Sequence, residues 1–466
     1  MLINTNAPVL SPDLSGTKLP FHDILSYLNI TNHSGIKIGI TSQSIKVMKK
    51  LLLLSALFPL ASMAQTTVEN VIVEPVDTIP LYDVLHQNAP HFMNIPDVPR
   101  FALLGKEHKF YMGIGANVKA IAVYDAGNPI ADPNSFVTSA IPMSVAPGNG
   151  GKFSLTAQQS NFYINVVALP GTKNQLGAYV DVVFTGTNYA PQLNHAYLKY
   201  RDVTAGYTFS IFSDAAAAPT TIDWQGINAF TGAKMGMIAY QPRFGKNKEW
   251  GLGVGLDMPN ASITNADHTV EVNQRVPNIP FYVQRSWADG EGWFRVSGVI
   301  RNLYYRDLAA DKNVDKVGWG IKASGKAPIY GGLTALYQAD YGKGLSSYIQ
   351  DLGGTGMDLM PDPDNADVLN PVPVWSGYLG LEYKFNPRLI STVAYGHVRT
   401  YAHDYTDSPS DWKSGYKYAQ YVVGNIFWNI NSIAQVGAEY LYGRRMNYDG
   451  RQAHDNRVEL QLQVSF

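Results

Sequence analysis

Cysteine is absent from all 466 residues, and charged residues make up only 16% of the chain. Disulfides, thiol catalysis and cysteine-based metal centres are therefore excluded. The formal net charge is −1, so the basic balance typical of nucleic-acid-binding proteins is missing. After Leu60 no segment has the roughly 20 apolar residues that a membrane-spanning helix requires. The apolar residues are instead dispersed along the chain, which argues against a helical membrane protein.

The last residues of the chain alternate strictly between apolar and polar. Val458, Leu460, Leu462, Val464 and Phe466 are apolar, and every residue between them is polar. Side chains alternate faces along a β-strand, so this strand has one apolar face and one polar face. About ten residues of such alternation, ending in an aromatic residue, are typical of a strand that crosses a membrane in a barrel.

The same alternation recurs along the chain between turn-forming residues. It predicts sixteen strands, at about 110–124, 152–168, 176–185, 193–200, 203–212, 230–240, 249–258, 278–287, 292–305, 315–326, 331–341, 374–386, 388–401, 415–429, 432–445 and 456–466. Short and long connections alternate between them, as in outer-membrane barrels with short periplasmic turns and long extracellular loops. We therefore predict an all-β fold, a transmembrane antiparallel barrel of about 16 strands.

A soluble β-sandwich or barrel would show a similar alternation. Sixteen strands, however, enclose an interior too wide for side chains to fill. We therefore expect the polar faces to line water and the apolar faces to meet lipid. In the strand at 203–212, for example, Val203, Phe209 and Ile211 are expected on the lipid face, and Thr204 and Thr208 in the lumen.

The N-terminal part predicts export. A basic start at 48–50, an apolar stretch at 51–60 and small residues at 62–64 form a secretory signal peptide, with cleavage before Gln65. Residues 1–47 are interpreted as an upstream extension from a misassigned start. Residues 65–109 are expected to be a proline-rich periplasmic segment that precedes the barrel at 110–466.

Several short runs resemble the DcaP-like outer-membrane porins over about residues 92–466. These runs are 158–162, 195–197, 205–210, 212–214, 221–226 and 297–301. The resemblance implies a homotrimer in the outer membrane whose arginine-rich pore passes small solutes, typically dicarboxylates.

Three positions depart from the family pattern. Asn161 and Asn194 stand where the family usually has arginine, and Tyr207 stands where glutamine is common. A dicarboxylate preference therefore does not transfer directly. The family's helical N-terminal extension is also not expected, because prolines should break any helix between Gln65 and Phe101; they are Pro75, Pro80, Pro90, Pro96 and Pro99.

Selectivity in a pore depends on charged side chains at a constriction. We expect the loop at 213–229, with Asp223, to fold inward and narrow the channel; an ordinary surface loop is the alternative. Arg295 and Arg301 lie six residues apart on one strand face and are expected to oppose Asp223. Further lumen-phase cations are Lys199, Lys322 and Arg457, the last near the outer mouth. The sequence predicts a weak anion preference, unless these cations are only solvated wall charges.

Other classes of function have little support. Two long loops contain acidic clusters whose carboxylate oxygens could bind calcium. The clusters match no dedicated calcium-binding motif, so no metal or cofactor is predicted. Their residues are Asp358, Asp362, Asp364 and Asp367 in one loop, and Asp404, Asp407 and Asp411 in the other. His195, His397 and His403 lie in no nucleophile context, and no G-x-S-x-G occurs, so no catalytic residue and no enzyme are predicted.

A diffusion channel for small hydrophilic solutes is the preferred hypothesis, with anionic or dicarboxylate solutes as the candidates. Its expected partners are outer-membrane lipid, small solutes and ions, and two further copies of the chain, with no nucleic acid. A barrel-anchored adhesin or scaffold is the alternative, although the longest loop, 342–373, has room for no module of its own. An outer-membrane barrel enzyme ranks below both.

Overall fold

The computed structural model describes residues 78–92, 95–96, 101–105, 109–362, 365, 367–402 and 415–466. The chain divides into two units, Met1–Val76 and Asp77–Phe466, and every described residue belongs to the second. The predicted upstream extension, signal peptide and cleavage site therefore lie outside the described residues. So does His403 with the acidic residues Asp404, Asp407 and Asp411.

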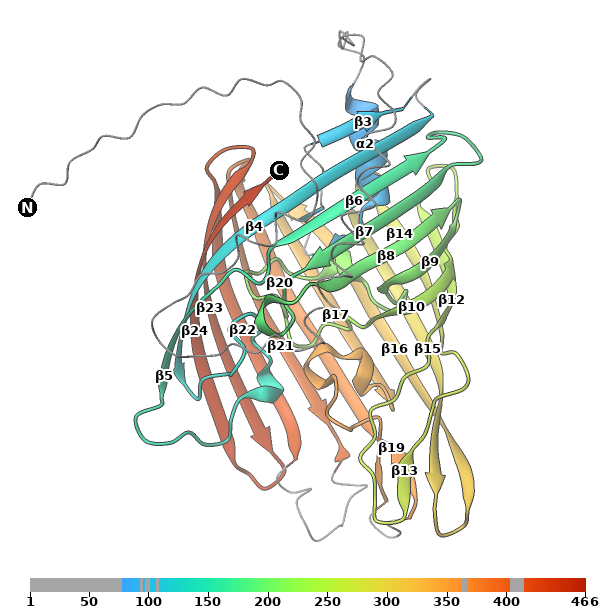
Figure 1. Cartoon of the computed structure of the whole chain (residues 1–466), viewed down its shortest axis with the longest axis vertical. Coiled ribbons are helices and arrows are strands. Elements are labelled where there is room, and N and C mark those ends of the chain that lie inside the picture. The colour runs from blue at the N-terminus through green and yellow to red at the C-terminus, as the bar shows by residue number, and fades with distance from the viewer. Residues whose placement is uncertain are drawn as a thin grey trace, which may run out of the picture. The chain divides into compact units, whose positions relative to one another are not determined.

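The second unit is a closed antiparallel barrel of 16 strands (Figure 1). One wall position is shared by two consecutive short strands, since β5 and β6 both pair with β4. The strands are β4 (Phe110–Gly127), β5 (Gly151–Thr156) with β6 (Asn161–Ala168), β7 (Leu176–Val183), β8 (Gln192–Tyr200), β9 (Val203–Phe209), β10 (Lys234–Tyr240), β12 (Trp250–Asp257), β14 (Ile279–Trp287), β15 (Gly292–Asp307), β16 (Lys312–Tyr330), β17 (Leu333–Lys343), β20 (Pro373–Asn386), β21 (Leu389–Thr400), β22 (Tyr416–Asn429), β23 (Ala434–Asn447) and β24 (Gln452–Ser465). The predicted fold class and strand count are confirmed.

Short strands extend the sheet at its margins. They are β3 (Phe101–Leu104) beside β4, β11 (Arg243–Phe244) beside β12 and β13 (Thr269–Glu271) beside β15. Short turns join strands at one end of the barrel, here called the short-turn end, where the C-terminus also lies. The longer connections lie at the other end, the long-loop end (Figure 1).

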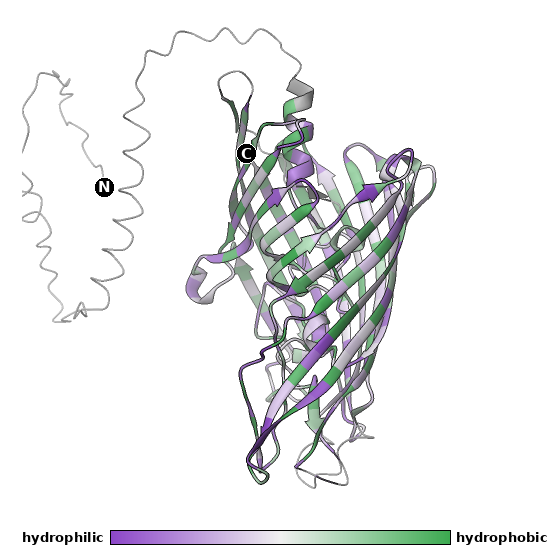
Figure 2. Cartoon of the chain, turned by 90° about the vertical axis from the view of Figure 1, so that its right-hand side faces the viewer, coloured by the Kyte–Doolittle hydropathy of each residue, from purple (hydrophilic) through white to green (hydrophobic). Residues whose placement is uncertain are grey.

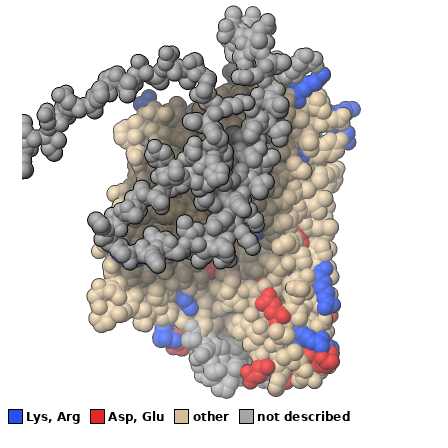
Figure 3. Space-filling view, in the orientation of Figure 1, with Lys and Arg blue, Asp and Glu red and all other residues tan. Residues whose placement is uncertain are grey.

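The two faces of the wall differ as the alternation predicts. On β24, the exposed fractions of Val458, Leu460 and Leu462 are 44%, 56% and 50%, whereas Arg457 and Glu459 are 0% exposed. Apolar and polar residues alternate along the strands in the same way in Figure 2. Where grey atoms do not cover the face that Figure 3 shows, most of the surface is uncharged, and charged side chains are visible near the upper right edge and in the lower part. The outer wall is therefore compatible with a lipid surface.

The prediction for the strand at 203–212 was right for Thr204 and Thr208, which are 7% and 8% exposed, and wrong for Phe209 and Ile211. Phe209 packs against Phe92 and Phe230 inside the barrel, with ring centroids 5.4 and 5.9 Å away. Ile211 is 4% exposed and belongs to a cluster of inward-facing side chains that includes Tyr282. The pairing of β9 with β8 and β10 passes Gly206 without a register shift and ends at Phe209. The chain then enters the barrel, because the loop that follows folds inward.

A helix, α2 (Thr78–Asn88), precedes the barrel, contrary to the prediction that proline would prevent one. Pro80 lies in the first turn, where its missing N–H removes no intrahelical hydrogen bond, and the helix ends before Pro90. Asn88 anchors α2 to the inner wall by donating to Asn165 Oδ1 at 2.6 Å. No helix among the described residues is long and apolar enough to cross a membrane.

The C-terminal residue closes the barrel. Phe466 N donates to Ala116 O at 2.9 Å, and Phe466 O accepts from Ala116 N at 2.5 Å, so the last residue extends the pairing of β24 with β4. Deleting Phe466 should lower the yield of folded protein in the membrane, because the closing strand loses both bonds and its terminal aromatic side chain. Heat-modifiability on gels measures this yield. An unchanged amount of folded protein would contradict the prediction.

Candidate functional site

The connection between β9 and β10 folds into the lumen, as predicted for residues 213–229. It contains a short 3-10 helix, η6 (Ala215–Ala217), and most of its residues are buried. Its backbone accepts hydrogen bonds from the inner wall: Tyr378 Oη donates to Ala217 O at 3.1 Å, and Asn425 Nδ2 donates to Thr220 O at 2.8 Å. The loop therefore lies against β20 and β22, on the inside of the barrel.

Asp214 anchors the start of this loop. Its carboxylate accepts from Trp293 Nε1 at 3.0 Å and Ser324 Oγ at 2.7 Å, and it lies 3.7 Å from the Arg295 guanidinium. Burial alone would raise the pKa of Asp214, but the charges of Arg295 and Lys322 hold it below its usual value. Asp214 is therefore an ionised carboxylate whose charge is matched by its neighbours.

Asp223 anchors the middle of the loop. It accepts from Phe136 N at 2.8 Å, Gln225 N at 3.1 Å and Tyr421 Oη at 3.0 Å. The backbone N–H groups of Ile222 and Asp223 both donate to Glu439 on β23, each at 2.9 Å. Burial raises the pKa of Asp223 above its ordinary value. Asp223 thus acts as a structural anchor of the loop.

Two more loops join the first inside the barrel. Asp351, in the connection between β17 and β20, accepts from Thr138 Oγ1 at 2.8 Å and Ser139 N at 3.0 Å, both in the β4–β5 connection, and from Tyr416 Oη at 3.0 Å on β22. Burial raises the pKa of Asp351. One carboxyl group therefore ties two loops to the wall.

Apolar side chains from these loops and the wall pack into one cluster, here called the loop core. Members include Phe136, Ile227, Leu352, Val398 and Tyr421, each no more than 1% exposed. The expectation that the inner face lines water is therefore wrong for this part of the lumen. The barrel is too wide for its own side chains to fill, but three inward loops supply the missing volume.

Arg301 does not oppose Asp223. Its side chain is 0% exposed and forms a bidentate pair with Asp358, of the β17–β20 connection, at 2.9 and 3.2 Å. The guanidinium also donates to Asn260 O at 2.6 Å and lies 5.2 Å from the Tyr348 ring centroid. Arg295, 16% exposed, faces Asp214 instead of Asp223. The predicted geometry was therefore wrong for both arginines.

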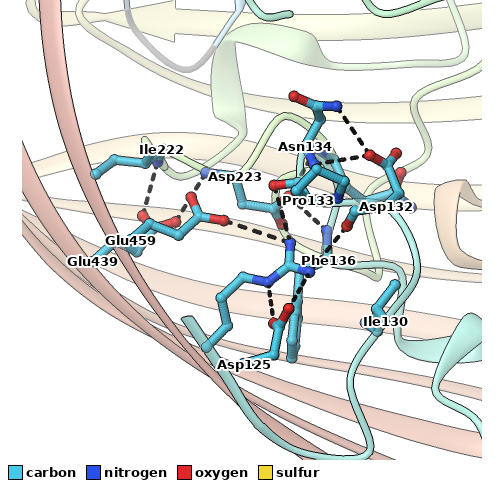
Figure 4. Close-up of polar contacts among 12 residues, drawn as sticks. Asp125, Ile130, Asp132, Pro133, Asn134, Phe136, Ile222, Asp223, Glu439 and Glu459 are labelled. Atoms are coloured by element: carbon cyan, nitrogen blue, oxygen red, sulfur yellow. Dashed lines mark hydrogen bonds and ion pairs between the residues drawn. The ribbon is translucent and has the colours of Figure 1, made fainter. Parts of the chain in front are cut away.

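Arg457 is buried near Asp223, in place of the two predicted arginines. It pairs with Asp125 on β4 at 2.6 and 3.3 Å and lies 3.6 Å from Glu459. Its guanidinium also donates to Asp132 O at 3.0 Å, in the β4–β5 connection. Figure 4 shows Asp125, Asp223, Glu439 and Glu459 gathered at this point of the inner wall.

The two predicted lysines are also held by protein groups. Lys322 is 2% exposed and donates to Thr231 Oγ1 at 2.9 Å. Lys199 donates to Asn88 O at 3.1 Å and Gln87 O at 3.3 Å, at the C-terminal end of α2, where the helix dipole favours a cation. Strand alternation correctly placed Lys322 and Lys199 on the inner face, but it gave no sign of these partners.

A cavity of about 660 Å³ lies between the loop and the short-turn end of the barrel. Its lining residues include Trp224 and Asp223 of the loop, Phe92 and Pro90 of the N-terminal segment, and Arg388 in the short turn between β20 and β21. We call this cavity the vestibule. Its volume lies in the range, about 300–1,000 Å³, that small-molecule sites occupy.

A row of hydrogen-bonded amide side chains crosses the vestibule wall. On one side, Gln435 donates to Asn429 at 2.9 Å, and Gln461 donates to Gln435 at 3.2 Å and to Gln463 at 3.4 Å. These four residues lie on three neighbouring strands, β22, β23 and β24.

The row continues across the barrel closure. Gln463 donates to Asn117 at 3.4 Å, Asn117 to Asn161 at 2.9 Å, and Asn161 to Asp181 at 2.9 Å. Asn194 donates to the other oxygen of Asp181 at 2.5 Å. This amide belt therefore spans seven neighbouring strands, from β22 through β24, β4, β6 and β7 to β8. The sequence motifs identify Asn161 and Asn194 only as individual positions. The belt could not be predicted from the sequence, because its members are far apart in the chain.

Among comparisons with known proteins, no family model matches this chain, and no curated protein matches it. Solved structures do. The outer membrane channel DcaP of Acinetobacter baumannii superimposes with a TM-score of 0.66 at 22% identity, over 78% of this chain and 100% of that one. An anion-selective porin from Comamonas acidovorans gives 0.49 at 11% identity over 77% and 100%. The OmpF of Salmonella typhi gives 0.48 at 10% over 78% and 100%. The likeness to DcaP that the sequence motifs indicated is confirmed at the level of the fold.

Proposed function

We propose that this protein is an outer-membrane diffusion channel for small hydrophilic solutes. The observation that carries the proposal is a closed barrel with an apolar outer wall, narrowed by three inward loops, one of which borders a polar vestibule. An apolar outer face around a polar interior is the arrangement of barrels that pass solutes through a membrane. The DcaP fold supports the same function, and a homotrimer is the assembly we propose for it.

Ion selectivity should be weak. Asp214, Asp358 and Asp125 match the charges of Arg295, Arg301 and Arg457 at distances of 3.7, 2.9 and 2.6 Å. Paired charges leave little net field in the lumen, and salt screens the remainder over about 8 Å at physiological strength. An anion or dicarboxylate preference, expected from the resemblance, would then rest on Arg295, which keeps 16% exposure.

Recording from the purified full-length protein in planar bilayers tests the proposal. We expect discrete conductance steps and, across a tenfold salt gradient, a reversal potential close to zero. Heat-denatured protein at the same concentration is the matched control. The absence of steps from folded protein would contradict the channel function. A reversal potential near the anion limit would instead contradict weak selectivity, and native mass spectrometry of the same sample tests the trimer.

A further inference from the structure

The amide belt makes the vestibule a surface of neutral hydrogen-bonding groups. Eight of the residues that line the vestibule are asparagine or glutamine. Each amide side chain offers two N–H donors and an oxygen with two lone pairs. Hydroxyl groups, which both donate and accept, can pair with any of these positions.

Some hydrogen-bond donors and acceptors of the belt are not used within the protein. Asn161 donates once, to Asp181, and accepts once, from Asn117. The Asn161 side chain therefore keeps one amide N–H and one oxygen lone pair that have no partner among the described residues. Gln159 also lines the vestibule and donates to Asn134 O at 3.3 Å, while its Oε1 has no hydrogen-bond partner in the described part of the chain. Buried polar atoms without partners are rare, so a bound solute or water is expected to satisfy this oxygen.

The charges around the vestibule balance. Apart from His195, the lining residues that carry a charge are Lys119, Arg388, Asp181 and Asp223, two cations and two carboxylates. Asp181 is already engaged by two belt amides, and Asp223 by its three loop and wall contacts. A charged solute therefore meets no excess of opposite charge, while an uncharged one meets a continuous row of donors and acceptors.

One aromatic side chain supplies flat apolar surface beside the belt. Trp224, half-buried, lines the vestibule from the inward loop, whereas Tyr163 of the wall is only 3% exposed and is stacked on Tyr179 with ring centroids 5.7 Å apart. An amphipathic ring next to amides matches a solute that has both hydroxyl groups and C–H faces.

From this combination we propose that the vestibule binds uncharged polyhydroxylated solutes, of which small saccharides are the representative class. The inference rests on the proposed channel function for its physiological meaning, since the vestibule would be the last stage of passage. The cavity of about 660 Å³ has room for a solute of disaccharide size with water. Selection would come from hydrogen-bond matching, and not from charge.

Current recordings with a neutral and a charged probe test the proposal. Maltose, added at the short-turn side, should reduce the ion current saturably, whereas succinate at equal concentration should have a smaller effect. Asn161→Leu and Gln435→Met should each raise the half-effective maltose concentration about fivefold, the loss expected for one ordinary hydrogen bond. Two variants at different points of the belt guard against a folding defect in either one.

Asn456→Leu is the matched control. Asn456 lies on β24, the strand that carries Gln461 and Gln463, but its side chain contacts Tyr440 and Ala126 O, away from the vestibule. It should leave the maltose effect unchanged. A current that maltose does not alter, or that succinate blocks more strongly, overturns the inference and leaves the channel function standing. If folded protein does not conduct, the channel function fails, and calorimetric titration of the detergent-solubilised protein with maltose then decides the inference alone.

Discussion

Replacing Arg457 with alanine should cause the largest loss of stability of any single substitution at the six predicted charges. The Arg457 side chain is 0% exposed, as are those of its partners Asp125 and Glu459. Removing one member of a buried ion pair leaves the other charge uncompensated, which costs about 3–5 kcal/mol. Glu459 is the most affected partner, because neither of its carboxylate oxygens has a hydrogen-bond partner among the described residues.

Heat-modifiability on gels, together with the loss of β-structure by circular dichroism, measures this effect. We expect the Arg457→Ala barrel to unfold at a clearly lower temperature than the wild type. Arg457→Lys should fall between the two, since lysine keeps the charge but loses the bidentate pairing with Asp125. Arg444→Ala is the control, because Arg444 contacts Gln452 at an exposed site on the adjacent strand.

A second substitution separates the stability lost through the unpaired charge from the stability lost through packing. Glu459→Gln in the Arg457→Ala background should recover a large part of the lost stability, because the unpaired buried charge disappears with little change in volume. Equal unfolding temperatures for Arg457→Ala and the wild type would show that the cluster in Figure 4 does not stabilise the barrel.

The wall of the barrel could be predicted from the sequence because the alternation of faces along a strand depends only on neighbouring residues. A strand alternates faces with a period of two, so Leu460 and Glu459 reveal their faces through their immediate neighbours. The same rule placed Lys322 and Arg301 on the inner face. It was wrong at Phe209, where β9 ends and the chain turns into the barrel, and the proline rule was wrong for α2, where Pro80 occupies a permitted position in the first turn.

The interior could not be predicted because its contacts join residues far apart in the chain. Arg301 and Asp358 are separated by 57 positions, and Arg457 and Asp125 by 332. Strand phase tells which charges face inward, but not whether a loop enters to neutralise them. The vestibule has the same origin, since Gln463 and Asn117 become neighbours only when β24 closes against β4, 346 positions away.

Replacing Arg301 with alanine should open the loop core and raise the single-channel conductance. Arg301 holds the β17–β20 connection through Asp358 and the β12–β14 connection through Asn260 O. Without the guanidinium, Asp358 is a buried carboxylate without its counter-ion, and the loops are expected to move so that water reaches it. A loss of about 3 kcal/mol corresponds to a roughly 100-fold shift in the docking equilibrium.

Conductance and reversal potential together distinguish this role from that of a selectivity residue. We expect Arg301→Ala to raise the conductance and to make the β17–β20 connection more sensitive to protease, with little change in reversal potential. Arg306→Ala is the control on the same strand, since its pair with Asp311 is exposed, at 34% and 88%, and such pairs contribute about 0–1 kcal/mol.

The double variant Arg301→Met with Asp358→Asn completes the test. It removes both charges, and the new amide oxygen can still accept from Ser262 N or Ser347 N, so the loops should dock again and the conductance should return toward that of the wild type. If Arg301→Ala instead moves the reversal potential toward cation preference at unchanged conductance, then Arg301 faces a water-filled neck. Its role would then be the selectivity role that the sequence alone predicted, and the loops would owe their position to other contacts.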